Sequence, residues 1–385
     1  MKNGIRTRVG VLAVVCSAAV MFITPGMALA STSSSSAAEV TAAVNKYANG
    51  LAANYTTHGS QPANSLEQEL VEQTTGEIST AKQHGLNVTH ATVTPQVVAV
   101  AKNTTGYSVT ADLTTSLNMT AKSGTTITLL GRKTDHLDSS ATDRHDLQLT
   151  RETGANNYSV TADSIQQEQN SDADQTKQLS AGANSAPSAL SDRSKWDSSA
   201  TQSTFGTNSV GVNYITEMKY ADTWTDNAHQ NKMNPDFPDD DDNCTNFVSQ
   251  SLYAAGLKTT YGNSFQTKDT SVWTWNLAGI AGQTWTWDNA NYNYTYMKDH
   301  SKTFTHGNNP DIAWEGSLLY GDWGRDGKYN HAMVVVGDVI TKNSTTPVID
   351  QKSPNRHDYL FSDSKANAVK EYKKVSWGVL QYKYN

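Results

Sequence analysis

Aromatic residues divide this chain into two parts. All nine tryptophans lie at residue 196 or later, and 13 of the 17 tyrosines lie at Tyr214 or later. The earlier part is rich in Thr, Ser and Ala, and residues 166–209 between them are polar without apolar periodicity. A chain of 385 residues is long enough for two domains. We therefore expect an N-terminal domain over residues 31–165, a linker over 166–209 and a C-terminal domain over 210–385, each folding on its own.

Residues 1–30 have the three parts of a secretory signal peptide. Lys2, Arg6 and Arg8 give a positive start, an apolar run follows, and Ala28-Leu29-Ala30 is a small-residue cleavage site. The apolar run is roughly 15 residues, short of the about 20 that span a membrane. We expect a secreted bacterial protein, extracellular or associated with the cell wall, without stable membrane insertion.

Charge excludes one class of partner. The net charge is -7 and the isoelectric point about 5.8, so the chain lacks the basic surface that nucleic acid requires. We expect no nucleic-acid partner. No motif indicates a cofactor, and no feature indicates an oligomeric state.

The N-terminal domain reads as α+β. Val40, Val44, Tyr47 and Leu51 form one apolar helical face, and a second helix is predicted from about Ser65 to near residue 85. Alternating strands follow, over residues 96–102, 107–113, 125–131, 146–152 and 157–163. This layout resembles the cystatin or SnoaL type of module. It contains no catalytic constellation.

Cys244 is the only cysteine outside the signal peptide, where Cys16 lies. Residues 244–255 have one apolar helical face, Gly256 suits a C-terminal cap, and Asp242 or Asn243 suits the N-cap. The thiol is therefore expected in the first turn, where the helix dipole favours the nucleophilic thiolate. The alternatives are an intermolecular bridge and an inert buried thiol.

A nucleophilic thiol needs a base, and His331 is the best candidate among ten histidines. It begins "HAMVVVG", a continuous apolar run that predicts a buried strand. From spacing alone, a histidine satisfied within the core is an equal alternative.

Two motifs resemble the putative amidase domain family of secreted Gram-positive proteins. They are "NPDFPDDDDNCTNFVSQSLYAAGL" and "YGDWGRDGKYNHAMVVVG", within a resemblance that covers roughly residues 210–385. The family is related to the CHAP and NlpC-type hydrolases, which implies a papain-like domain with a helix packed on an antiparallel sheet. By the same resemblance, Cys244 takes the position of the nucleophile and His331 that of the base.

The third catalytic position is open between two neighbours. Gln351 and Asp350 lie on the strand expected after the histidine strand, and adjacent strand residues point to opposite faces, so only one can orient His331. Family sequences often read "SQH" here, which favours Gln351. This chain has Asp350-Gln351-Lys352 instead, so Asp350 remains an alternative.

The aspartates at 239–242 should oppose a thiolate. Consecutive aspartates lack the alternating spacing of a calcium loop, so we predict a solvated loop and no metal site.

Four tryptophans lie between the proposed nucleophile and base. Trp273, Trp275, Trp285 and Trp287 are predicted to border the cleft and stack against a substrate, with core packing as the alternative.

Together these features predict a secreted cysteine amidase or peptidase that cleaves amide bonds, with peptidoglycan peptide or another peptide as substrate. The alternatives are a secreted protease without a wall role and a non-catalytic surface-binding protein that uses a papain-like domain.

Overall fold

The computed structural model describes residues 34–56, 65–154, 157–166, 211–240, 242–261, 267–277, 282–372 and 374–383. The predicted signal peptide lies outside these residues, as does the predicted linker after residue 166. Within the described residues, no helix is long and apolar enough to cross a membrane.

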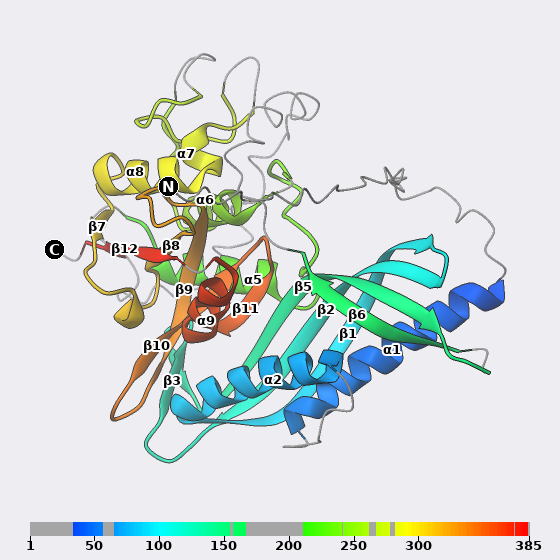
Figure 1. The fold of residues 1–385 in the computed structure, drawn as a ribbon. Helices are drawn as coiled ribbons and strands as arrows, with labels where there is room; N and C mark the ends of the chain where they lie inside the picture. Colours follow the sequence, from blue (N-terminus) through cyan, green and yellow to red (C-terminus); the bar gives the residue numbers. More distant parts are fainter. Residues whose placement is uncertain are drawn as a thin grey trace, which may run out of the picture.

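Two helices and an antiparallel meander form the N-terminal part. Helices α1 (Ser34–Thr56) and α2 (Ser65–Gln83) lie across one face of the strands (Figure 1). Val40 and Val44 of α1 are buried there, as their spacing predicts. The meander runs through β1 (Leu86–Lys102), β2 (Gly106–Ala121), β5 (His136–Arg151) and β6 (Tyr158–Ile165).

Strands β1, β2 and β5 extend well beyond the predicted segments, whereas β6 lies within two residues of its prediction. The prediction for β5 began at residue 146, whereas the strand begins at His136. Its early part buries Ser139, Ser140 and Thr142. This part of the strand has polar residues on both faces, so it lacks the alternation of apolar and polar residues from which strands are predicted.

A short hairpin leaves the meander between β2 and β5. It consists of β3 (Thr126–Leu129) and β4 (Arg132–Thr134). Ile127 of β3 is fully buried.

The C-terminal part alternates helices with short strands. Its helical elements are α5 (Tyr214–Thr225), α6 (Cys244–Ala254), α7 (Trp285–Asp288), α8 (Ala290–Asp299), the 3-10 turn η3 (Pro310–Ile312) and α9 (Phe361–Tyr372). Its strands are β7 (Phe304–His306), β8 (Leu318–Asp322), β9 (His331–Ile340), β10 (Thr345–Gln351), β11 (Arg356–Leu360) and β12 (Ser376–Tyr382).

One sheet runs through both parts. Its strand order is β1-β2-β5-β11-β10-β9-β8-β12-β7. Strand β11 pairs with β5, with Arg356 opposite Ala141, and β3 pairs with β9, with Ile127 opposite Val339. Strands β8 and β3 occupy the same edge of β9, one after the other. The two predicted domains are therefore joined through backbone hydrogen bonds at two places (Figure 1).

The core is shared as well. One cluster of buried side chains contains Leu86, Ile127 and Leu137 from the N-terminal part together with Phe247 and Val336 from the C-terminal part. The fold is thus a mixed α+β structure built on an antiparallel sheet, as expected, while the papain-like arrangement stays a prediction.

Candidate active site

Helix α6 begins at Cys244, which confirms the prediction that the thiol lies in its first turn. The helix ends as expected: Gly256 has φ +106°, and the Leu257 N–H donates to the carbonyl of Leu252 at 3.0 Å. Phe247, Val248 and Leu252 are fully buried. Burial on this scale fixes the position of the thiol, whose residue is only 3% exposed.

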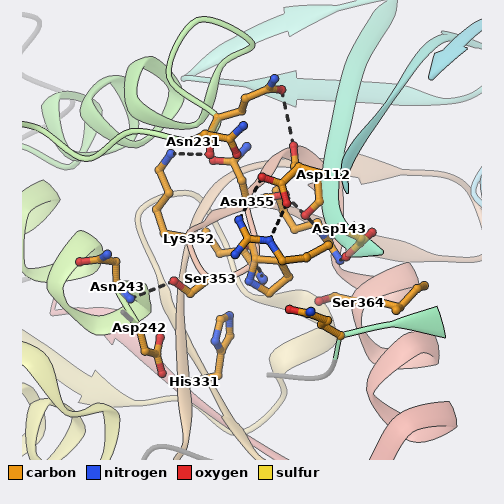
Figure 2. Close-up of a pocket in the computed structure, with 18 of the residues that line it drawn as sticks. Asp112, Asp143, Asn231, Asp242, Asn243, His331, Lys352, Ser353, Asn355 and Ser364 are labelled. Carbon is orange, nitrogen blue, oxygen red and sulfur yellow. Dashed lines mark hydrogen bonds and ion pairs between the residues drawn. The ribbon is translucent and has the colours of Figure 1, made fainter. Parts of the chain in front are cut away.

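The N-cap of α6 is Asn243, but its side chain does not cap the helix. Its Oδ1 instead accepts from the Asn246 side chain at 2.9 Å and from the Asp240 N–H at 3.1 Å. Its own N–H donates to Ser353 Oγ at 2.9 Å, which ties the helix start to the turn after β10 (Figure 2). The helix start is therefore fixed by polar side chains on both sides.

The described aspartates of the acidic run hold this start together. Asp239 accepts from the Asn243 side chain at 2.9 Å, Asp240 accepts from the Gln283 amide, and Asp242 accepts from the Cys244 N–H at 3.3 Å. Burial raises the pKa of Asp242. Asp239 is exposed, as expected of a solvated loop, whereas Asp240 and Asp242 are partly buried.

His331 is the first residue of β9 and is only 2% exposed. The Cys244 thiol donates to the carbonyl of Asn330, the preceding residue, across 3.9 Å. The Trp323 ring stacks on the imidazole, with centroids 5.7 Å apart and planes at 27°. Burial lowers the pKa of His331 to about 4, although a hydrogen bond with the Gln351 side chain opposes this shift. The imidazole is thus neutral near pH 7, the form that can accept a proton.

Gln351 and Asp350 point to opposite sides of β10. The Gln351 side chain lies close enough to the His331 ring to raise its pKa, and its Nε2 donates to the Pro354 carbonyl at 3.2 Å. Its Oε1 has no hydrogen-bond partner among the described residues. Asp350 Oδ1 accepts from the Asp358 N–H at 2.7 Å, away from His331. The structure therefore brings Gln351, and not Asp350, to the histidine.

A cavity of about 1150 Å³ opens beside these residues. His331, Gln351, Asp242 and Asn243 line it, whereas Cys244 is buried and is not a lining residue. Residues of β2 and β5 form the other wall: Asp112, Thr142, Asp143 and Arg144 (Figure 2). The N-terminal part thus forms one side of the candidate site.

The four tryptophans predicted to bind substrate do not line this cavity. Trp273 and Trp287 are fully buried, and their Nε1 atoms donate to Ser249 Oγ at 3.1 Å and Asn246 Oδ1 at 2.8 Å. A stacking role is therefore wrong for both, because neither ring has an exposed face. Trp275 packs against Tyr253 with centroids 4.4 Å apart, and Lys268 Nζ lies 4.0 Å above the Trp285 ring.

Several cavity residues were not predicted. Trp323 both lines the cavity and stacks on His331, and its place directly after β8, in "YGDW", was the available signal. Arg356 joins the two walls by donating to Asp143 at 2.6 Å. That contact depends on the pairing of β5 with β11. These strands lie far apart in the sequence, so neither segment by itself predicts the pairing.

Comparison with known proteins found one similarity, in the C-terminal part of the chain. The sequence model of one family, described as a putative amidase domain, matches residues 211–376. Residues 211–376 are therefore similar to a putative amidase domain. The match runs from the residues before α5 to the first residue of β12, and so includes Cys244, His331 and Gln351. It indicates hydrolysis of amides in general. No curated protein and no solved structure matched the chain.

Proposed function

We propose that this protein is a cysteine-dependent amide hydrolase with Cys244 as nucleophile, His331 as base and Gln351 as the residue that orients the imidazole. One observation carries the proposal: the amidase domain holds the Cys244 thiol at the start of α6, against the residue that precedes His331. A helix N-terminus favours thiolate, and a neutral buried imidazole can accept the thiol proton.

In the proposed reaction, His331 carries the proton between Cys244, the leaving amine and water. The Cys244 thiol gives its proton to His331, and the sulfur attacks the amide carbonyl carbon to form a tetrahedral intermediate. The protonated imidazole then gives this proton to the leaving amine as the C–N bond breaks, which leaves a thioester. Water attacks the thioester, losing a proton to His331, and the acid is released with the thiol restored.

Oxyanion stabilisation requires a change at Asp242. The Cys244 N–H is the natural donor to the oxyanion, but its acceptor in this structure is the Asp242 carboxyl at 3.3 Å. A carboxylate in that place would repel a developing negative charge. We infer that substrate displaces the Asp242 side chain when its carbonyl binds.

The cavity supports a peptide substrate that carries an amino group. Asp239, Asp240 and Asp242 line the catalytic end together with Lys352, whose pKa burial lowers to about 7, so three carboxylates outnumber one cation there. Two of the cavity's cations, Arg144 and Arg356, are engaged by Asp112 and Asp143 on the far wall. A carboxylate-rich site attracts ammonium groups and repels acidic polymers. Together with the predicted signal peptide, this favours peptides of the bacterial cell wall, cleaved by a secreted, papain-like enzyme.

Cys244→Ser and His331→Ala test the mechanism on purified peptidoglycan and on a soluble peptide amide. Each variant should lose activity by several orders of magnitude, and the double variant should lose little more, because the two groups act as one unit. His300→Ala, which removes an exposed histidine, is the matched control. Activity near that of the parent in either single variant would contradict the assignment.

The released products separate the remaining alternatives. New amines or carboxylates from peptidoglycan without new reducing ends support the wall amidase. Cleavage of casein but not peptidoglycan would indicate a protease without a wall role. Tight retention on peptidoglycan without any product would indicate a binding protein.

A further inference from the structure

A second cluster of polar side chains lies on the other side of β10. Asp222 of α5 and His357 and Asp358 of β11 place one potential ligand atom each within 4.8 Å of one another. In the described part of the chain, these are the only three histidine, cysteine or acidic residues so grouped. Asp350 of β10 adjoins them, with its Oδ1 3.8 Å from His357 Nδ1. Three separate elements therefore converge on one point.

Hydrogen bonding indicates which nitrogen of His357 is available to a ligand. The Thr225 hydroxyl donates to the Ala221 carbonyl at 2.9 Å, so its oxygen can accept from His357 Nδ1 at 3.0 Å. With the proton on Nδ1, the Nε2 lone pair faces Asp358 Oδ2 at 3.7 Å. Two electron-rich atoms then face each other, which is unfavourable unless a cation or a proton lies between them.

Two buried carboxylates of the cluster retain acceptor capacity. Asp358 is 4% exposed and Asp350 is fully buried, yet Asp358 Oδ1 and Asp350 Oδ2 have no hydrogen-bond partner among the described residues. Buried polar atoms are normally satisfied, so two such atoms in one cluster indicate an absent partner.

Neighbouring cations do not supply that partner. Lys352 Nζ donates to the carbonyls of His229 and Gln230, at 2.7 and 3.3 Å. Arg356 is directed to Asp143 on β5. Among the described residues, His357 alone lies within ion-pair distance of Asp350 and Asp358.

We propose that Asp222, His357 and Asp358 bind one divalent transition-metal ion, Zn²⁺ or Mn²⁺, with Asp350 as an adjoining carboxylate. One imidazole with several carboxylates is a donor set that these ions accept. Bonds of about 2.0–2.2 Å place tetrahedral ligand atoms roughly 3.3 Å apart, so the 3.7 Å gap would close by a few tenths of an ångström. The Thr225–His357 hydrogen bond supplies the orientation that metal-binding histidines usually have.

The ion would act on structure and not on the reaction itself. It would join α5, β10 and β11, and β10 carries Gln351 directly beside Asp350. The site lies on the face of β10 opposite His331, so the inference does not depend on the proposed function.

Metal titration of the full chain tests the site. The untagged protein in a Cys244→Ser background, which removes the thiol as a competing ligand, is stripped with chelator and titrated with Zn²⁺, Mn²⁺ and Ca²⁺ by calorimetry and thermal unfolding. We expect about one Zn²⁺ or Mn²⁺ per chain and a rise in Tm on binding.

Asp222→Asn and His357→Gln should each weaken the affinity at least tenfold and remove the rise in Tm. Asp222 and His357 are partly exposed, so at least one variant should fold. Asp338→Asn, which changes a partly buried carboxylate on β9, should bind as the parent does. Absence of saturable binding in the parent, preference for Ca²⁺ alone, or equal affinity in all three variants would overturn the proposal.

Discussion

At the scale of single residues, the sequence limited the proposed third catalytic position to Gln351 and Asp350, and these neighbours point to opposite sides of their strand. Gln351 reaches the His331 ring, while Asp350 faces Asp358 and His357 on the other side of β10. The geometry favours the same residue as the family resemblance, and the catalytic role of Gln351 stays a proposal. An amide in this position can hold the imidazole without adding a second negative charge beside the thiol.

Gln351→Ala should lower kcat by about 10- to 100-fold with little change in KM, because it removes an orienting contact and not a substrate contact. Asp350→Asn should lower kcat much less. Steady-state kinetics on a soluble peptide amide measure both, and circular dichroism checks that the variants fold. If Asp350→Asn were the more damaging change, the assignment of Gln351 would be wrong.

His331 should also make stability depend on pH. The pKa of His331 is about 4 in the folded protein and 6.5 when unperturbed. Between pH 4 and pH 6.5, His331 is therefore protonated in the unfolded chain and neutral in the folded protein. The free energy of unfolding therefore falls as pH decreases from about 6.5 to 4.

Urea unfolding at pH 7, 5.5 and 4.5 measures this effect. His331→Gln should lose less stability than the parent across that range, while the exposed-site control His300→Gln should follow the parent. Parallel curves for all three proteins would show that His331 is not buried in its neutral form.

At the scale of elements, the sequence predicted the helix ends and strands that are determined by neighbouring residues along the chain. The cap at Gly256, the start of α6 at Cys244 and the buried strand after His331 follow from periodicity and turn chemistry. The faces of the tryptophans did not follow, because alternate positions such as Trp273 and Trp275 differ in burial only once their neighbours are known. Strand pairing between distant segments was also beyond prediction, since β3 is a short segment of ordinary strand sequence whose partner, β9, lies about 200 residues away.

The pairing of β3 with β9 depends on Gly337. A Cβ at this position would lie 2.2 Å from the Thr128 carbonyl oxygen of β3, too close for any side chain. Gly337→Ala should therefore displace β3 and lower the free energy of unfolding by about 1–3 kcal/mol. Gly324→Ala is the control, because the nearest atom to its Cβ would be 3.7 Å away. Chemical denaturation of both variants measures the difference. Equal free energies of unfolding for the two variants would mean that β3 can move away from β9 without loss of stability.

At the scale of the whole molecule, the two parts of the chain differ in composition but share one sheet and one core. The Thr- and Ser-rich part supplies β5 and β3 to the sheet, buries Leu86, Ile127 and Leu137 in the common core, and forms the far wall of the cavity. Composition reports what each segment contains, whereas a shared core is a property of their contact. A fragment from residue 204 onward contains the C-terminal domain that the sequence predicts to fold on its own, but it would leave this core open.

We therefore expect the fragment of residues 204–385 to be far less stable than the full chain, although it holds every proposed catalytic residue. Without β3, the outer part of β9 loses its neighbour on one edge, and an unpaired apolar edge promotes aggregation. Adding residues 31–166 as a separate polypeptide should restore solubility and part of the activity, because both junctions can form between two chains. Thermal unfolding, size-exclusion chromatography and hydrolysis of a peptide amide measure these effects. A fragment that unfolds cooperatively at the Tm of the full chain, and hydrolyses the amide at the same rate, would show that the joined sheet contributes nothing to the candidate site.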